Sequence, residues 1–271
     1  MNLKYTIGSI LFFPLLPVMY LQGKKIKNSM PKLPEAKGAE GRSVSNKLVT
    51  RTLKMLVIGE STIAGVGVKT HEEGFTGTLA NELSAHLSAD IIWKVYARSG
   101  YTAKKVNQRI VPKLIETDSD LIIVGLGGND AFTLNKPAKW RSEVAMLITN
   151  LRAKFPNAPI VFCSMPPIKE FPAFTPLIKA TIGSLVEVLG EELFDLIKEF
   201  DNVYYQHQIL TLKNWNKKFG LDCTEADYFS DGVHPSKLAY QTWAKDLGDV
   251  IVNQEKLRNT LLQSELSLPF E

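Results

Sequence analysis

Short apolar runs alternate with longer stretches of helical periodicity along most of the chain. Runs of strand length lie at residues 55–58, 91–97, 121–126, 159–164 and 203–205. Helical patterns lie at 74–88, 102–116, 137–154 and 176–199, and a last one begins near Pro235. Strands that alternate with helices are typical of a parallel sheet covered on both faces. The pattern therefore predicts an α/β protein, a three-layer α/β/α sandwich with a central parallel sheet.

Two segments need a separate interpretation. The spacing of apolar residues in 176–199 favours core packing over a lipid-binding face. The segment before it, 166–176 (PPIKEFPAFTP), has four prolines and no periodicity, so it predicts an irregular loop. Phe171 and Phe174 lie in this loop after the end of a strand. They either line a substrate pocket or belong to a plain connection.

The chain begins with an apolar run, Ile7 to Leu21, that contains Pro14 and Pro17. This run is shorter than the ~20 residues that span a bilayer, and proline weakens a helix. Three lysines follow it, Lys24, Lys25 and Lys27, and no small-residue cleavage site is present. We expect an uncleaved segment held in or partly through a membrane surface. The alternative is a helix docked on the protein's own surface.

Composition divides the rest of the chain into a linker, a main domain and a tail. Residues 28–48 are rich in Pro, Gly, Lys, Glu and Ser, which is typical of a linker. The expected organisation is an anchor with a basic flank (1–27), the linker (28–48), one main domain (49–253) and a C-terminal tail (254–271). If the anchor spans a membrane, the lysines after it favour the cytoplasmic face for the main domain.

The net charge of +4 is unevenly distributed. Residues 1–54 carry ten Lys and Arg against two acidic residues, whereas the remainder carries 22 against 26. Nucleic-acid binding needs a basic face, so an acidic body predicts no nucleic-acid partner. The two cysteines and four histidines have no ligand spacing, so we expect no disulfide framework and no metal site.

The candidate chemistry begins at residues 54–67, KMLVIGESTIAGVG. Met55 to Ile58 are expected to form a buried strand that stops at Gly59. Ser61 then lies in a tight turn beyond the sheet edge, where open α/β sheets place their ligands. A serine there either reacts with a ligand or simply caps the turn or the next helix.

Three glycine-rich motifs do not fit this stretch. A phosphate-binding loop needs G-x-x-x-x-G-K-[ST], but Gly65 to Thr70 has the wrong spacing. A dinucleotide fingerprint needs a third glycine after Gly65 and Gly67, and none follows. The nucleophile elbow G-x-S-x-G also fails around Ser61.

Two later stretches favour a reactive serine. In DGVHP, Asp231 precedes His234 by three residues, a spacing at which the carboxylate can accept from one ring nitrogen. The other nitrogen is then free to act as a base. In GLGGND (125–130), Asn129 follows another buried strand. Serine, amide, carboxylate and imidazole are thus expected on one rim of the sheet.

These blocks resemble those of the SGNH hydrolase (GDSL esterase/lipase) superfamily. They are Gly59-Glu60-Ser61, the Gly100 of ARSGYTA, Gly127-Gly128-Asn129-Asp130 and Asp231-x-x-His234, in the family's order. The resemblance implies a flavodoxin-like sandwich and makes residues 49–253 the catalytic domain. It implies a nucleophile at Ser61, a base at His234 and its orienting partner at Asp231. It also implies an oxyanion hole formed by Ser61, Gly100 and Asn129.

The activity implied by the resemblance is hydrolysis of carboxylic esters through an acyl-enzyme, without a cofactor. A small-molecule, lipid or glycan ester would be the substrate, so a lysophospholipase, a thioesterase and a carbohydrate O-deacetylase stay open. A hypothesis of another class is a catalytically silent, membrane-anchored relative that binds a ligand.

One residue departs from the family pattern. The family has Gly-Asp-Ser where this chain has Glu60 before Ser61. We expect a nearby basic or hydroxyl group to take up the extra methylene, so that Glu60→Asp is tolerated.

Overall fold

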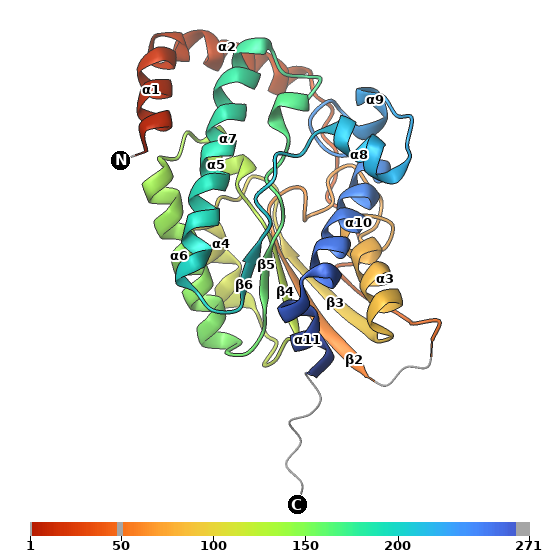
Figure 1. Cartoon of the computed structure of the whole chain (residues 1–271). Coiled ribbons are helices and arrows are strands. Elements are labelled where there is room, and N and C mark those ends of the chain that lie inside the picture. The colour runs from red at the N-terminus through yellow and green to blue at the C-terminus, as the bar shows by residue number, and fades with distance from the viewer. Residues whose placement is uncertain (1, 48–50, 264–271) are drawn as a thin grey trace, which may run out of the picture.

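A computed structural model describes residues 2–47 and 51–263 (Figure 1). Six strands form its central sheet: β1 (Glu40–Ser43), β2 (Thr52–Gly59), β3 (Asp90–Ala97), β4 (Leu121–Gly125), β5 (Ile160–Phe162) and β6 (Val203–Tyr205). Their order is β1-β3-β2-β4-β5-β6. The pairs from β3 to β6 are parallel, and only the edge strand β1 is antiparallel.

Helices cover both faces of the sheet. One layer holds α4 (Ala103–Arg109), α6 (Pro137–Lys154) and α7 (Pro176–Leu196). The other holds α3 (Phe75–Leu87), α8 (Leu212–Phe219), α10 (Lys237–Asn253) and α11 (Glu255–Gln263). Shorter helices, α5 (Gly128–Phe132) and α9 (Glu225–Tyr228), lie near the carboxyl ends of the strands (Figure 1). This arrangement confirms the predicted three-layer sandwich.

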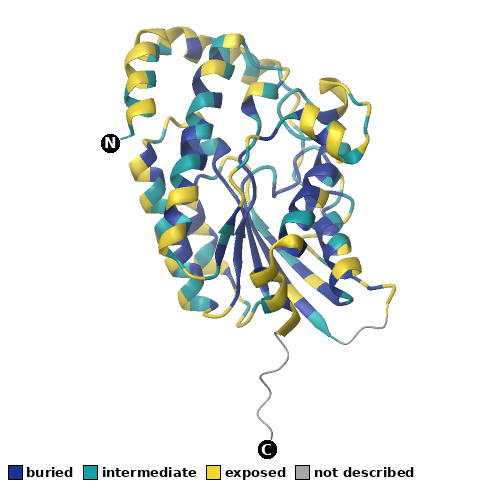
Figure 2. Cartoon of the chain, in the orientation of Figure 1, coloured by how far each residue is buried: buried dark blue, intermediate teal, exposed yellow. Residues whose placement is uncertain are grey.

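The apolar runs became strands because both faces of the central strands are covered. Along β2, Leu56 and Ile58 pack into the cluster under α6 and α7, whereas Met55 and Val57 pack under α3 and α10. All four are at most 3% exposed. Figure 2 shows the central strands mostly dark blue, between helices with one buried and one exposed face.

The strand order places the site. Without β1, the order in the sheet is that of a flavodoxin-like fold, and the direction of winding reverses between β2 and β4. Ligands of such sheets bind beyond the carboxyl ends of the strands at this point. Ser61 follows β2 and Asn129 is in α5, just after β4, so the two residues flank the reversal.

The boundaries of the predicted elements differ little from those observed. The expected helix 102–116 ends early, as α4 and a 3-10 turn, Val111–Lys113, that contains Pro112. Proline cannot donate the helical hydrogen bond, which accounts for the break. Helices α8, α9 and α11 were not predicted, because each is too short for a clear helical pattern.

The predicted linker 28–48 needs correction where the structure describes it. It contains β1, which pairs with β3 through Glu40 to Ser43. Before β1, the Ala36 N–H donates to the Ala64 carbonyl at 2.9 Å, and the Lys37 N–H donates to the Lys69 carbonyl at 3.0 Å. These are backbone contacts that leave no signal in the side-chain pattern. Residue 48 lies outside the described residues.

The predicted tail 254–271 also contains structure. Its first part forms α11, in which Leu257 and Leu261 are at most 1% exposed and pack on the α3/α10 layer. Residues 264–271 lie outside the described part of the chain.

The N-terminal run is helical despite its prolines. Helix α1 (Leu3–Phe12) continues through a 3-10 turn, Phe13–Leu15, into α2 (Leu16–Ser29). Pro14 and Pro17 both lie near the start of a helical segment, where a missing N–H costs little. The segment is therefore longer than the 15-residue run suggested.

By length and composition, Leu3–Ser29 is long and apolar enough to cross a membrane, with a mean hydropathy of 1.4 and 6% of its most apolar window buried. An anchor and a signal sequence both meet these criteria. Among the residues described, no other helix does.

Candidate active site

The turn that carries Ser61 is set by close backbone packing at the end of β2. A Cβ added to Gly59 would lie 2.4 Å from the Gly125 carbonyl oxygen of β4, so only glycine fits here. The Ile63 side chain folds back over the same point and is 1% exposed. The Ser61 carbonyl accepts from the Val66 N–H at 3.1 Å, which closes the turn.

The Ser61 turn packs against the loop before α10. The Tyr240 hydroxyl donates to the Val66 carbonyl at 2.8 Å, and the Ser230 hydroxyl donates to the Gly67 carbonyl at 3.3 Å. The first contact joins the serine turn to α10, and the second joins it to the loop that carries Asp231 and His234.

Asp231 and His234 form a preorganised pair. His234 Nδ1 lies 2.8 Å from Asp231 Oδ2. Asp231 Oδ1 accepts from the backbone N–H of Val233 at 2.9 Å and of His234 at 2.7 Å. The aspartate side chain is fully buried and that of the histidine is 22% exposed. The carboxylate therefore fixes the ring orientation and leaves Nε2 on the open side, as the spacing predicted.

Asn129 and the loop after β3 lie next to each other. Asn129 Nδ2 donates to the Tyr101 carbonyl at 3.1 Å, which ties the side chain to the residue after Gly100. Gly100 has a φ of +77° and is exposed. Within the described residues, the backbone N–H groups of Ser61 and Gly100 have no hydrogen-bond acceptor. The structure thus places these three predicted residues beside the reversal point of the sheet.

Glu60 caps the helix that carries Asn129. Its carboxylate accepts from the Gly128 N–H at 2.9 Å and from the Asn129 N–H at 2.8 Å. A Cβ at Gly128 would lie 2.9 Å from Glu60 Oε1, so the carboxylate approaches closely because this residue is glycine. The partner is therefore backbone, and the expectation of a basic or hydroxyl partner was wrong.

Burial sets the ionisation of Glu60. Desolvation raises its pKa to about 7, with a smaller contribution from the nearby charge of Asp130, while the two backbone N–H groups oppose the rise. Asp130 is fully buried as well, and burial also raises the pKa of its carboxyl. It accepts from the Ala103 N–H at 2.9 Å and the Asn135 amide at 2.7 Å, which ties α5 to α4.

A second carboxylate holds the Gly100 loop from the other side. Glu35, in the predicted linker, accepts from the Ser99 N–H at 2.8 Å and from Arg98 at 3.2 Å. The loop is thus fixed between Glu35 and Asn129. The role of Glu35 could not be predicted from the sequence, since nothing in the local pattern relates this residue to a loop 64 residues away.

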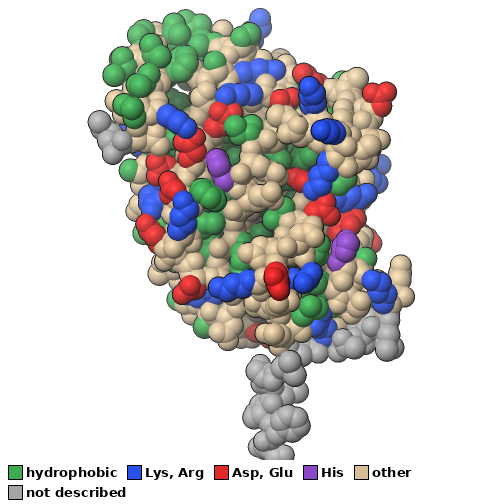
Figure 3. All heavy atoms as spheres, in the orientation of Figure 1, with side chains coloured by type: hydrophobic (Ala, Val, Ile, Leu, Met, Phe, Trp, Pro, Cys, Tyr) green, Lys and Arg blue, Asp and Glu red, His purple; other side chains and the backbone are tan. Residues whose placement is uncertain are grey.

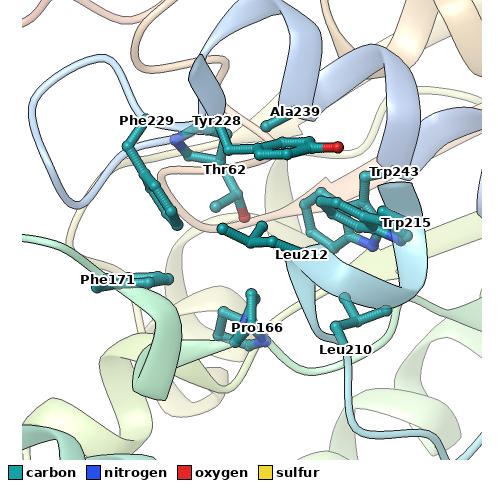
Figure 4. A pocket seen from close by; sticks show the side chains of 12 residues that line it. Thr62, Pro166, Phe171, Leu210, Leu212, Trp215, Tyr228, Phe229, Ala239 and Trp243 are labelled. Carbon is teal, nitrogen blue, oxygen red and sulfur yellow. The ribbon is translucent and has the colours of Figure 1, made fainter. Parts of the chain in front are cut away.

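An apolar pocket lies beside the serine turn (Figure 4). Its walls include Thr62, next to Ser61, and Pro235, next to His234, and it encloses about 30 Å³. Phe171 lines it and contacts the Phe229 ring at a centroid distance of 5.1 Å. Phe174 packs on the far side of Phe171, at 5.4 Å, and on Phe132 of α5, at 5.5 Å. Of the two predicted aromatic residues, Phe171 therefore lines this pocket and Phe174 supports it.

A sequence profile of the GDSL-like Lipase/Acylhydrolase family matches residues 57–242, which include every site residue predicted from the sequence but not Glu35. The chain belongs to this family. The resemblance seen in the sequence is thereby confirmed. Among curated proteins, none matches the chain significantly.

Solved structures support the same fold for this GDSL-like protein. The crystal structure of TesA is 20% identical, with a TM-score of 0.54, over 72% of this chain and 95% of that chain. The psychrotrophic esterase EstA from Pseudoalteromonas sp. is 17% identical, with a TM-score of 0.54, over 75% and 98%. Axe2, an acetylxylan esterase from Geobacillus stearothermophilus, is 15% identical, with a TM-score of 0.52, over 75% and 93%.

Proposed function

We propose that this GDSL-like acylhydrolase cleaves carboxylic esters through an acyl-enzyme formed on Ser61. The observation that carries the proposal is the Asp231–His234 pair, 2.8 Å apart, on a loop packed against the serine turn. A buried carboxylate, a partly exposed imidazole and a hydroxyl beyond a strand end are the components of a nucleophilic triad.

In the proposed first step, His234 Nε2 takes the Ser61 proton as Oγ bonds to the ester carbonyl carbon. The tetrahedral intermediate collapses, and the alcohol leaves with the proton from His234. Water then repeats the sequence on the acyl-enzyme and releases the acid. Asp231 holds the required tautomer and stabilises the imidazolium throughout.

The proposed oxyanion hole consists of the Ser61 and Gly100 N–H groups and the Asn129 amide. The unused N–H groups and the fixed Asn129 side chain support this role. Such donors meet charge that develops in the transition state, and losing one costs on the order of 10² to 10³ in turnover.

The small apolar pocket favours a short acyl group. At about 30 Å³ it offers room for one or two water-sized groups beside Thr62. This observation favours acetyl esters, and Axe2 is a structural neighbour named as an acetylxylan esterase. A lysophospholipase or thioesterase is the second candidate, favoured by the apolar N-terminal helices.

A panel of nitrophenyl esters from acetate to palmitate, with O-acetylated glycans and lysophospholipids, tests the proposal. We expect hydrolysis of at least one class, and Ser61→Ala should remove it while the circular dichroism spectrum stays unchanged. Hydrolysis of none would favour the silent ligand-binding relative. An alanine variant that kept a tenth of the turnover would rule out Ser61 as the nucleophile.

We also propose that residues 1–27 hold the protein at a membrane, with Lys24, Lys25 and Lys27 near anionic headgroups. Each such lysine contributes about 1 kcal/mol near an anionic surface, and the positive charge after the apolar run favours the cytoplasmic face. Replacing Ile10, Leu11 and Leu21 by Gln should move the full-length protein from the membrane pellet to the supernatant. Hydrolysis of a soluble acetyl ester should not change. A native protein already found wholly in the supernatant would contradict the proposal.

A further inference from the structure

The N-terminal helices form an arch over α7, outside the segment that the family profile matches. At one end, Asn2 donates to Glu192 at 3.0 Å and Lys4 pairs with Glu191. At the other end, Gln22 bonds to the Thr175 hydroxyl, at the N-cap of α7, at 2.7 Å. Figure 1 shows α1 and α2 at the top of the view, at the end of the molecule where α7 begins.

A cavity of about 590 Å³ lies beneath this arch. This volume falls within the ~300–1,000 Å³ of pockets that enclose small organic ligands. The floor is made by short side chains of α7, such as Thr181, Ser184 and Val188, which leave the space open. The roof is made by larger apolar ones, among them Phe12 and Leu16.

The chemistry of the walls selects an alkyl chain. The lining is mainly apolar, and the charged residues Lys4 and Glu191, which pair with each other, together with Lys136 and Glu187, also border the cavity. Leu134 closes one side, two residues after α5, the helix that carries Asn129. An alkyl chain in this space would bury mainly apolar side chains, which favours its transfer from water.

The outer face of the same helices indicates the source of the alkyl chain. Large apolar side chains of these helices are exposed, each by at least 38%: Leu3, Ile7, Ile10, Leu11, Phe13, Leu15, Val18, Tyr20 and Leu21. Figure 3 shows them as a continuous apolar surface at one end of the molecule, with the molecule hollowed below it. A patch of this kind marks a membrane contact when lysines follow it. Lys24, Lys25 and Lys27 come directly after it.

We propose that this cavity is a binding site for the alkyl chain of a single-chain membrane amphiphile. The outer face of the arch contacts the bilayer, and the inner face takes one chain from it. The site is separate from the small pocket beside Thr62, and its occupation does not depend on the ester hydrolase proposal.

Gly8 offers a clean test, because it lines the cavity and a Cβ at this position meets nothing within 4 Å. Gly8→Trp should fill the space without a clash. Gly23→Trp is the matched control, since Gly23 lies in α2, has equal room for a Cβ and does not line the cavity. Ser184→Phe fills the cavity from the opposite wall and covers the case in which the Gly8 variant fails to fold.

Binding is measured by titrating full-length protein with cis-parinaric acid, a free fatty acid that has no ester bond to cleave. Excluding even two methylenes at ~0.8 kcal/mol each lowers the affinity by about tenfold. We expect this loss for Gly8→Trp and Ser184→Phe, with little change for Gly23→Trp. Equal affinity in all three variants, or no saturable binding, would overturn the proposal.

Ester hydrolysis by the variants with Ser61 intact shows whether the substrate or another lipid supplies the alkyl chain. A fall in palmitate hydrolysis with unchanged acetate hydrolysis in Gly8→Trp would mean that the substrate supplies the chain. Unchanged hydrolysis of both, with weaker parinaric acid binding, would mean that a lipid that is not hydrolysed supplies it. Either result supports the site, whereas failure of every ester with intact probe binding would count only against the hydrolase proposal.

Discussion

Asp231 illustrates how much a single side chain fixes at this site. One oxygen accepts two backbone N–H groups and the other faces His234 Nδ1, with the side chain fully buried. In Asp231→Asn, one oxygen can still accept from the backbone. The new amide then faces Nδ1 as a donor, which favours the tautomer with the proton on Nε2.

We therefore expect Asp231→Asn to lower kcat by on the order of 10³ to 10⁴ with an unchanged fold, because the base carries its proton on the wrong nitrogen. His234→Ala should lower it at least as far. Steady-state kinetics on the best ester measures both variants. A milder effect of the histidine change than of the aspartate change would contradict these roles.

Glu60 leads to a prediction about pH. Its pKa rises from an ordinary 4.5 to about 7 in the folded protein. The folded state thus binds the proton more tightly than the unfolded chain. The contribution of this group to stability is fully present below pH 4.5 and is lost as the pH rises to about 7.

Glu60→Gln removes this titration. The free energy of unfolding of the wild type should fall, relative to that of the variant, by roughly 3 kcal/mol between pH 4.5 and pH 7.5. Urea unfolding of both proteins at several pH values measures the difference. A difference that does not change with pH would show that Glu60 titrates normally.

The candidate site residues could be predicted from the sequence because their types and order are local signals. The partners of Glu60 could not be predicted, because they are backbone N–H groups 68 and 69 residues away. A side-chain pattern carries no record of backbone donors. With these partners known, shortening the residue to Asp is expected to pull the carboxylate away from α5 rather than to be tolerated.

Among the elements, β1 and the segment before it differ most from the sequence-based prediction. Glu35 was expected in a linker, yet it holds the Ser99 N–H beside Gly100. Glu35→Gln should lower kcat about tenfold, with KM and the thermal midpoint nearly unchanged, because it loosens a donor loop that acts in the transition state. A second carboxylate of the predicted linker, Glu40, is 76% exposed and lies 3.8 Å from Lys94, so Glu40→Gln is the matched control.

An equal fall in kcat in Glu35→Gln and Glu40→Gln would show that Glu35 has no special role in the loop. Deletion through residue 45, which a flexible linker would tolerate, is expected to be damaging for the same reason, since it removes both Glu35 and β1.

The elements of the sheet and its covering layers were predictable because burial on both faces leaves continuous apolar runs. The edge strand was not, since Glu40 to Ser43 are held by pairing with β3 and only Ser43 is buried. The length of the N-terminal helical segment was underestimated for a different reason. Its prolines lie where a helix begins, so they do not break it as they would in its interior.

At the scale of the whole molecule, two apolar features lie at one end of the protein. The small pocket belongs to the loops of the family fold, whereas the large cavity belongs to the N-terminal arch. The arch combines the two alternatives drawn from the sequence, because one face docks on α7 and the other is exposed. This arrangement would place the candidate active site close to a membrane surface.

The covalent step on Ser61 is the central claim, and labelling with a fluorophosphonate tests it most directly. Reaction of the full-length protein with this reagent, followed by tryptic mass mapping, shows which residue carries the adduct. We predict one adduct per chain, on Ser61, and its loss in His234→Ala. An adduct on another residue such as Ser99, or ester hydrolysis that continues after Ser61 is fully labelled, would contradict the account.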